Sequence, residues 1–210
     1  MVFKKEFEKY GFDTIIACSG TDITDTMIEE CFKIDREFYN QEYSIENSQI
    51  KNIIKNFGQI CFVLIEQTEQ KVIGYSYWIP IKPKVFLEFL DSGKILLNLE
   101  LSQCSNFNEK SVSLFSAGEA FLAGYDLNNL HKAVEDLFLH KILVLARKGI
   151  KVDYVAMEAV CDYDKIYLAP KLGMEKGATK ENSVFYCVPY SPKTVYPESS
   201  VSKELLNFYS

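Results

Sequence analysis

Hydrophobic and polar positions along the middle of the chain follow two different periods, which together predict a strand, a helix and a second strand. An apolar, β-like run covers residues 112–123. The polar residues 126–129 then offer short side chains that cap a helix, and Gly149 tolerates the left-handed conformation in which helices often end. A nearly continuous apolar run at 152–160 predicts a strand covered on both faces. Because a helix separates the two strands, we expect them to be parallel and joined by a right-handed crossover.

The predicted helix is amphipathic. Its apolar side chains recur at helical spacing on one face, which comprises Leu130, Val134, Leu137, Phe138, Ile142 and Leu145. In open α/β sheets, ligands tend to bind where the carboxyl ends of strands meet the amino ends of helices. We therefore expect the functional site in this strand–helix–strand unit.

The same reasoning predicts further elements on both sides of this unit. They are a strand at 12–17, helices at 22–35 and 41–57, a hairpin of strands at 60–65 and 72–79, an amphipathic stretch at 85–90, a short helix at 162–171, and a strand pair at 174–176 and 183–188. We expect Pro80 and Pro83 to break the sheet, and Pro170 to bend or end the short helix. Three later prolines predict a C-terminal arm at 189–210, outside a single domain at 1–188.

Composition narrows the function classes. Of the 210 residues, 48% are hydrophobic and 25% are charged, as in an ordinary soluble domain. A net charge of −6 argues against nucleic acid or an anionic membrane as the partner. No apolar run is long enough to span a membrane, and the amino terminus lacks the apolar core of a signal peptide. We therefore expect a cytoplasmic protein.

The six cysteines show no paired spacing and have few histidines nearby, which argues against a metal site. We interpret them as small buried hydrophobic residues. Cys161, at the end of the second parallel strand, has the alternative role of a nucleophile. The buried interpretation is favoured because no histidine lies near Cys161 in the sequence to activate it.

Four segments stand in an order that is typical of one enzyme family. They are VLIEQTEQKVIGYSYWIPI (63–81), KILVLARKGI (141–150), VDYVAMEAVCDYDKIYLAPKLGMEKG (152–177) and TKENSVFYCV (179–188). These segments resemble parts of the GNAT superfamily of acyl-CoA-dependent N-acyltransferases. The first resembles the family's β-hairpin and the second the end of its cofactor-binding helix. The third resembles its fifth strand with the short helix and turn that follow, and the fourth its last strand. The resemblance implies an α/β (α+β) fold with a GNAT-like mixed, mostly antiparallel sheet flanked by helices, and one parallel strand pair at a cofactor cleft.

The resemblance also implies a reaction, in which an acetyl (acyl) group passes from acetyl-CoA to a primary amine of a small molecule or peptide, without a metal. Two family positions differ here. The family's phosphate loop, usually Q/R-x-x-G-x-G/A, falls on Asn129, Lys132 and Val134 when counted back from Gly149. The general-acid tyrosine falls on Ala169. The sequence thus leaves open a catalytically degenerate GNAT-fold binding module, or a transferase for a longer acyl chain.

The first turn of the long helix is the predicted binding site for the cofactor phosphates, because its free N–H groups and its dipole favour anions. The predicted residues are Asn129, His131, Lys132, Ala133 and Val134. The alternative is a plain capped helix that faces solvent. By the resemblance, the backbone of Phe121, Leu122 and Ala123 at the strand end polarises the thioester carbonyl as an oxyanion hole.

Glu119 is the predicted proton acceptor. An alkylamine, with a pKa of about 10.4, must lose a proton before it attacks, and a carboxylate inside a small, apolar strand needs a partner or a cleft. The alternative is a glutamate paired with a lysine or exposed to solvent. Glu158 is a second candidate carboxylate, and Tyr167 or Tyr163 on the short helix takes the role of the general acid. The oligomeric state, including a homodimer, is left open.

Overall fold

The computed structural model describes residues 2–38, 47–92, 99–159, 164–179 and 184–209. Their fold is α/β, with a mixed, mostly antiparallel sheet of eight strands flanked by helices, as predicted. The chain groups into two compact units. Unit 1 comprises Met1–Ile79 and Gly118–Phe138, and unit 2 comprises Pro80–Ala117 and Leu139–Ser210. That residues 1–188 form a single domain stays a prediction.

Unit 1 contains four antiparallel strands in sequence order. They are β1 (Val2–Phe3), β2 (Ile15–Ser19), β3 (Cys61–Glu66) and β4 (Lys71–Ile81). The hairpin of β3 and β4 is the predicted one, with its turn at 67–70. The end of β5 (Ser111–Phe121) follows β4, and beyond it the Leu122 N–H donates to the Ile73 carbonyl at 2.8 Å.

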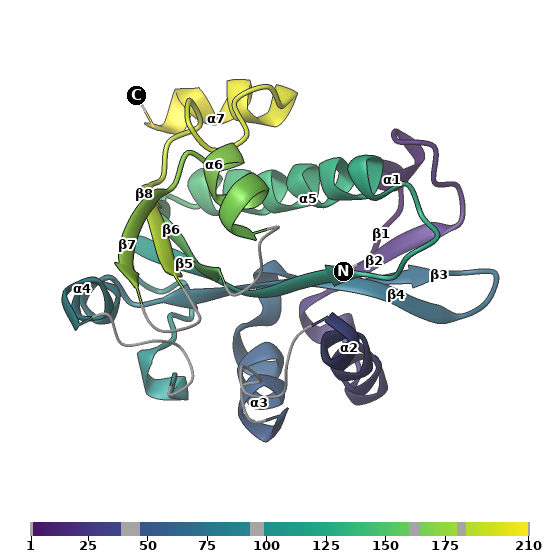
Figure 1. Ribbon diagram of the computed structural model, residues 1–210. Helices are drawn as coiled ribbons and strands as arrows, with labels where there is room; N and C mark the ends of the chain where they lie inside the picture. Colours follow the sequence, from purple (N-terminus) through teal and green to yellow (C-terminus); the bar gives the residue numbers. More distant parts are fainter. Residues whose placement is uncertain (1, 39–46, 93–98, 160–163, 180–183, 210) are drawn as a thin grey trace. The chain divides into compact units, whose positions relative to one another are not determined.

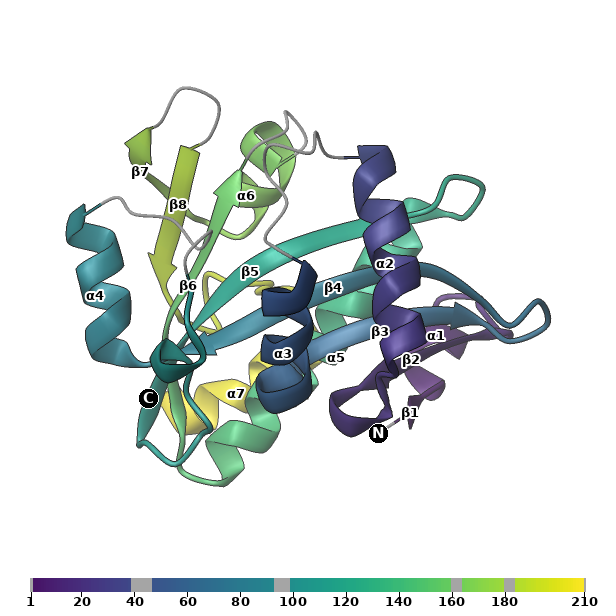
Figure 2. The ribbon, with the colours of Figure 1, turned by 90° about the horizontal axis from the view of Figure 1, so that it is seen from below.

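The helices of unit 1 cover both faces of these strands. They are α1 (Lys5–Glu8), α2 (Asp25–Phe38), α3 (Asn47–Phe57) and the first part of α5 (Leu127–Arg147). Figure 1 shows α2 and α3 on one face and α1 with the start of α5 on the other, and Figure 2 looks onto the face that carries α2 and α3. The Met27 N–H donates to Oγ1 of Thr24 at 3.2 Å, so Thr24 caps α2. Residues 41–46 of the predicted second helix lie outside the described residues.

Unit 2 contains the parallel pair that the sequence predicts. β5 pairs with β6 (Lys151–Ala159) in parallel, from Ser111 opposite Lys151 to Ser116 opposite Met157. β6 pairs antiparallel with β8 (Val184–Pro189), and β8 pairs antiparallel with β7 (Glu175–Thr179). The predicted final strand pair is therefore confirmed.

Helix α5 buries the predicted apolar face: Leu130, Val134, Leu137, Phe138, Ile142 and Leu145 are all buried. The helix begins at Leu127, within the predicted capping residues 126–129, and ends before Gly149, whose φ of +78° suits glycine. Burial of this face against the strands stabilises the helix more than its intrinsic propensity does.

One prediction about prolines was wrong. Pro80 does not break the sheet, because it lies within β4, where its carbonyl accepts the Ser105 N–H at 2.9 Å. Proline lacks only the donor, so a strand end that needs its carbonyl alone tolerates it. Pro83 begins α4 (Pro83–Ser92), and Pro170 lies in the first turn of α6 (Ala169–Lys171), after the π-helical turn η6 (Asp164–Leu168). Both prolines start helices, where no N–H is required.

The residues after β8 leave the sheet and end in a helix that the sequence analysis did not predict, α7 (Ser200–Tyr209). This helix packs within unit 2. Val201 and Leu205 are buried, Glu204 pairs with Arg147 at 2.5 Å, and the Tyr209 hydroxyl accepts the Val152 N–H at 2.8 Å. None of the described helices is long and apolar enough to cross a bilayer.

Candidate active site

The end of β5 packs tightly against β4 inside unit 1. A Cβ atom on Gly74 would lie 2.4 Å from Cδ1 of Phe121 and 2.7 Å from the carbonyl oxygen of Ala120, so only glycine permits this approach. Phe121 is buried, and its ring meets the His131 ring edge-on with centroids 4.9 Å apart. The strand end is thereby fixed against the start of α5.

Glu119 and His131 form a polar pair at this junction. His131 Nδ1 lies 2.9 Å from Glu119 Oε1, and the two side chains are only 16% and 15% exposed. Glu119 lies in β5 just before the connecting loop, and His131 lies on α5 just after it. The pair therefore joins the two ends of this loop, and we call it the Glu119–His131 clasp. The role of Glu119 as proton acceptor stays a prediction.

An acidic residue caps the start of α5. The Asn129 N–H donates to Oδ1 of Asp126 at 3.2 Å, and the Asn129 side-chain amide donates to Oδ2 at 3.0 Å. A carboxylate thus already accepts a hydrogen bond from one of the N–H groups that could otherwise bind an anionic ligand. The sequence suggested both a phosphate site and a plain capped helix, and the hydrogen bonds show the cap.

The remaining groups at this helix start still fit a pyrophosphate. Asn128 and Lys132 are exposed, and the first turn of any α-helix leaves backbone donors unpaired by the helix itself. Ala133 and Val134 are buried and lie past the first turn, so they face the core of unit 1. Cofactor binding at this end of α5 would therefore depend on Lys132 and the first-turn donors, against the negative charge of Asp126.

Part of the backbone that is predicted to polarise the thioester is already hydrogen-bonded within the sheet. The Leu122 N–H is bonded to Ile73, Phe121 is buried, and Ala123 is exposed. Of the three residues, Ala123 is the one that the structure leaves open to a ligand. The oxyanion role stays a prediction.

The other predicted site residues lie elsewhere or are not described. Tyr167 belongs to η6 in unit 2, where the structure describes its backbone, and Cys161 and Tyr163 lie outside the described residues. Four of the other five cysteines are buried and Cys187 is half-buried. Burial raises the pKa of the Cys31 and Cys104 thiols to about 12, which makes them inert at neutral pH. In the described part of the chain, no three potential metal ligands come together.

A second polar cluster, which the sequence analysis missed, lies on the other face of β5. Successive residues of a strand point to opposite faces, so Gly118 faces away from the clasp. A Cβ on Gly118 would lie 3.3 Å from Cε2 and Oη of Tyr75, and the Tyr75 hydroxyl donates to Oδ1 of Asp35 on α2. The signal in the sequence was the position of Asp35 on the apolar face of its helix, beside Cys31 and Ile34.

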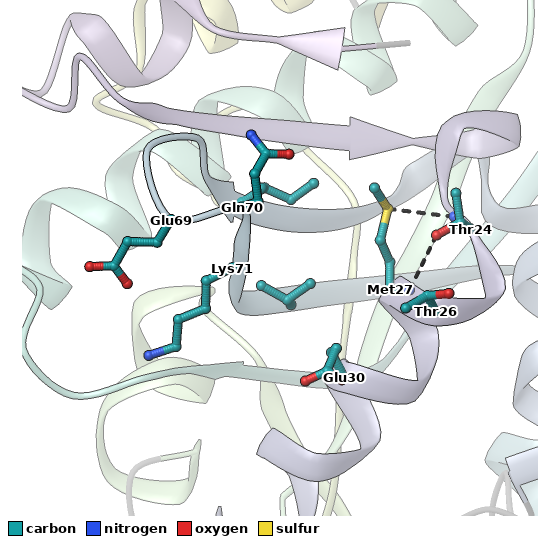
Figure 3. A pocket seen from close by; sticks show the side chains of 9 residues that line it. Thr24, Thr26, Met27, Glu30, Glu69, Gln70 and Lys71 are labelled. Carbon is teal, nitrogen blue, oxygen red and sulfur yellow. Dashed lines mark hydrogen bonds between the residues drawn. The ribbon is translucent and has the colours of Figure 1, made fainter.

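Unit 1 also has a pocket of about 510 Å³ between the start of α2 and the β3–β4 hairpin (Figure 3). Its polar lining includes Thr24, Thr26, Glu30, Glu69 and Lys71. The pocket contains none of the residues predicted from the sequence as site residues. Its open, mixed lining identifies no ligand.

Comparison with known proteins tests the fold. No protein-family model and no curated protein matches the sequence. Among solved structures, the chain is similar to the GphF GNAT-like decarboxylase in complex with isobutyryl-CoA, with a TM-score of 0.59 and 12% identity over 82% of this chain and 98% of that one. It is also similar to a chain of the NatC complex bound to Gag peptide and CoA, with a TM-score of 0.54 and 10% identity over 84% and 99% of the chains.

A third similar structure is FeeM, an N-acyl amino acid synthase from uncultured soil microbes, with a TM-score of 0.51 and 14% identity over 83% of this chain and 89% of that one. All three structures match most of the chain at low sequence identity. Such likenesses report on the arrangement of helices and strands, and the predicted elements are present in the predicted order. The chain therefore has the fold of the GNAT superfamily.

Proposed function

We propose that the protein transfers an acyl group from an acyl-CoA to a primary amine of a small molecule or peptide. The observation that carries this proposal is the Glu119–His131 clasp, which joins the strand end before the loop to the helix start after it. Preorganised backbone at such a junction suits phosphate binding and charge stabilisation. Proteins with the same fold are solved with isobutyryl-CoA and with a peptide and CoA.

Acyl-CoA, when bound, supplies an activated thioester. The residues of this chain that would hold it are Lys132, by its charge, and the first-turn backbone of α5 with Asn128. The clasp keeps these groups in place relative to the strand end. The amine must then be stripped of a proton, a role that the sequence assigns to Glu119.

The test is binding of CoA and acetyl-CoA, measured by titration calorimetry at low and high salt. Lys132→Glu should weaken CoA binding by about 5–30-fold, since two units of charge change near the phosphates, and should flatten the salt dependence. Lys148→Glu makes the same charge change at an exposed position just beyond the other end of α5 and should leave affinity unchanged. Absence of CoA binding at millimolar ligand would overturn the proposal.

A second candidate, a GNAT-fold binding module without catalysis, is favoured by one observation. Asp126 caps α5 and places a negative charge where an anionic cofactor would bind. Release of free CoA thiol in the presence of a panel of primary amines distinguishes the two functions, because a binding module releases none.

A further inference from the structure

The His131 side chain is directed back toward the strand that precedes its helix. It lies on the second turn of α5, and its Nδ1 atom lies 2.9 Å from Oε1 of Glu119 in β5. Its ring also meets the Phe121 ring edge-on, with an interplanar angle of 82°. Glu119 and Phe121 are two residues apart in the strand, so they point to the same face, where His131 contacts both. The sequence placed His131 among the phosphate ligands, whereas the structure directs its Nδ1 at a carboxylate.

The Phe121 ring that restrains His131 is itself fixed in the sheet. Phe121 is buried, and a Cβ atom on Gly74 of β4 would lie 2.4 Å from its Cδ1, so the ring lies directly against the neighbouring strand. The edge-on separation of 4.9 Å between the centroids of Phe121 and His131 is a favourable one for two rings. The ring contact therefore restrains the tilt of the imidazole, and the hydrogen bond restrains the direction of Nδ1.

The chemistry of the donor distinguishes Glu119 from a purely structural ion pair. A carboxylate only accepts hydrogen bonds, so with Glu119 ionised the bonding proton lies on Nδ1, and a neutral imidazole can supply it. Asp136, another shielded carboxylate of unit 1, receives instead the ammonium group of Lys9 at 2.6 Å. A positive partner of that kind disfavours uptake of a proton by the carboxylate. Of the two carboxylates, Glu119 has the partner that suits a proton acceptor.

Glu119 also keeps part of its surface open. Its side chain is 15% exposed and Gly118 beside it is half-buried, whereas the next two residues of the strand, Ala120 and Phe121, are buried. A carboxylate offers about four lone-pair sites, so the hydrogen bond from His131 is compatible with uptake of a proton. An amine that reaches the exposed part of Glu119 meets a carboxylate whose orientation is already restrained.

We propose that His131 is a positioning residue for the proton transfer: its Nδ1–H, restrained by Phe121, holds the Glu119 carboxylate in the orientation that accepts the proton of the amine. This rests on the acyl transfer proposed above and deepens it. It also moves His131 from the cofactor phosphates to the acceptor half of the reaction. Proton transfer depends on the alignment of donor and acceptor, so the effect of His131 belongs in turnover and not in CoA affinity.

The step balances as follows in protons and bonds. Glu119 takes one proton from R–NH₃⁺, and the free amine attacks the thioester carbonyl. The new C–N bond forms, the C–S bond breaks, and the second nitrogen proton leaves with the thiolate as CoA–SH. The proton on Glu119 passes to solvent, and His131 keeps its Nδ1 proton throughout. No oxidant, reductant or metal is needed.

The test compares two substitutions of nearly the same shape. Asparagine carries its amide nitrogen the same number of bonds from the backbone as Nδ1, and leucine has a methyl group there without a donor. His131→Leu should lower kcat by about 10–10²-fold at unchanged CoA affinity, because the carboxylate loses its alignment. His131→Asn should recover most of this loss. His140→Leu, at an exposed position of the same helix, is the control and should leave kcat unchanged.

Two outcomes of these kinetics would overturn the proposal. Equal kcat values in His131→Leu and His131→Asn would show that the donor contributes nothing. A loss of CoA affinity in His131→Leu, with kcat retained, would return His131 to the cofactor. Urea denaturation of each variant establishes that the rates belong to folded protein.

NMR tests the hydrogen bond without turnover. The chain contains two histidines, so isotope-labelled histidine gives two sets of ring signals, which His140→Leu assigns. At pH 8 His131 should carry its proton on Nδ1, and a proton on Nε2 alone would overturn the proposal whether or not CoA binds. Absence of wild-type turnover with every amine refutes acyl transfer itself. Wild-type turnover with equal rates in the two His131 variants refutes the role of His131 alone.

Discussion

Asp126 decides whether the start of α5 accepts or repels a cofactor phosphate. Its carboxylate is bonded to both the N–H and the side-chain amide of Asn129, so it cannot move away without loss of the cap. Asp126→Asn is the informative change, because asparagine caps helices about as well as aspartate. The substitution removes the charge and keeps the hydrogen-bond acceptor.

The expected size follows from the charges at this exposed helix end. Two unit charges about 4 Å apart in water interact by about 1 kcal/mol, and a pyrophosphate presents roughly two charges at somewhat larger distances. Asp126→Asn should therefore tighten CoA binding by about 1–2 kcal/mol, or roughly 5–30-fold at low salt. Asp126→Asn should change the free energy of unfolding by less than about 0.5 kcal/mol. Asp126→Ala, which removes the cap, should lower it by about 1 kcal/mol.

Titration calorimetry with CoA at 20 and 200 mM salt measures the change in CoA affinity. Urea denaturation measures the change in the free energy of unfolding for each substitution at the cap. The gain in affinity should shrink at high salt, because a Debye length near 10 Å screens exposed charges. Dephospho-CoA, which lacks a phosphate far from the pyrophosphate, should show the same gain. Equal affinities of wild type and Asp126→Asn at low salt would refute a pyrophosphate site at this helix.

Two further predictions concern stability. Gly118→Ala should lower the free energy of unfolding by about 1–3 kcal/mol, because φ is +139° and the new Cβ meets Tyr75. Gly124→Ala, at φ +101° with nothing within 4 Å, is the control for backbone strain alone, so equal losses in urea would show that the Tyr75 contact contributes nothing. Because burial raises the pKa of Asp35, the folded state binds its proton more tightly, and stability should fall as the pH rises from the unfolded pKa through the folded one. Asp35→Asn should remove this slope, and a wild-type slope of opposite sign between pH 4 and 7 would contradict the reasoning.

Much of the fold was readable because burial repeats with the period of each element. The face of α5 from Leu130 to Leu145 and the buried strand β6 both follow that rule, and the parallel pairing then follows from the helix between two strands. The resemblance to the GNAT superfamily supplied the order of elements. Both arguments use only the local pattern of residues and the order of segments, and neither requires knowledge of which residues far apart in the sequence contact one another.

The misses arise where tertiary context decides. A proline in a sequence predicts the end of a strand. Pro80 nevertheless lies within β4, because the Ser105 N–H bonds to the Pro80 carbonyl and no N–H of Pro80 is needed. Helix α7 follows a proline-containing segment, and its bonded partners are far away in the sequence, since Glu204 pairs with Arg147 and Tyr209 bonds to Val152. The cap at Asp126 was predicted only as one of several polar residues, since its bonds to Asn129 appear only in three dimensions.

The sequence pointed to one strand for the candidate site but could not say which face of that strand each side chain occupies. Glu119 was chosen for its charge in an apolar strand, and its neighbour Gly118 was not, although the two point to opposite faces of β5. Asp35 meets the sheet from the α2 face, through the Tyr75 hydroxyl, while Glu119 lies on the α5 face with His131. The two carboxylates therefore have different surroundings, and Glu119 is the one beside the predicted cofactor loop. If Glu119→Gln weakens CoA binding and leaves the pH profile of kcat/KM in place, Glu119 holds the loop. If it abolishes turnover at unchanged CoA affinity, Glu119 takes the proton of the amine.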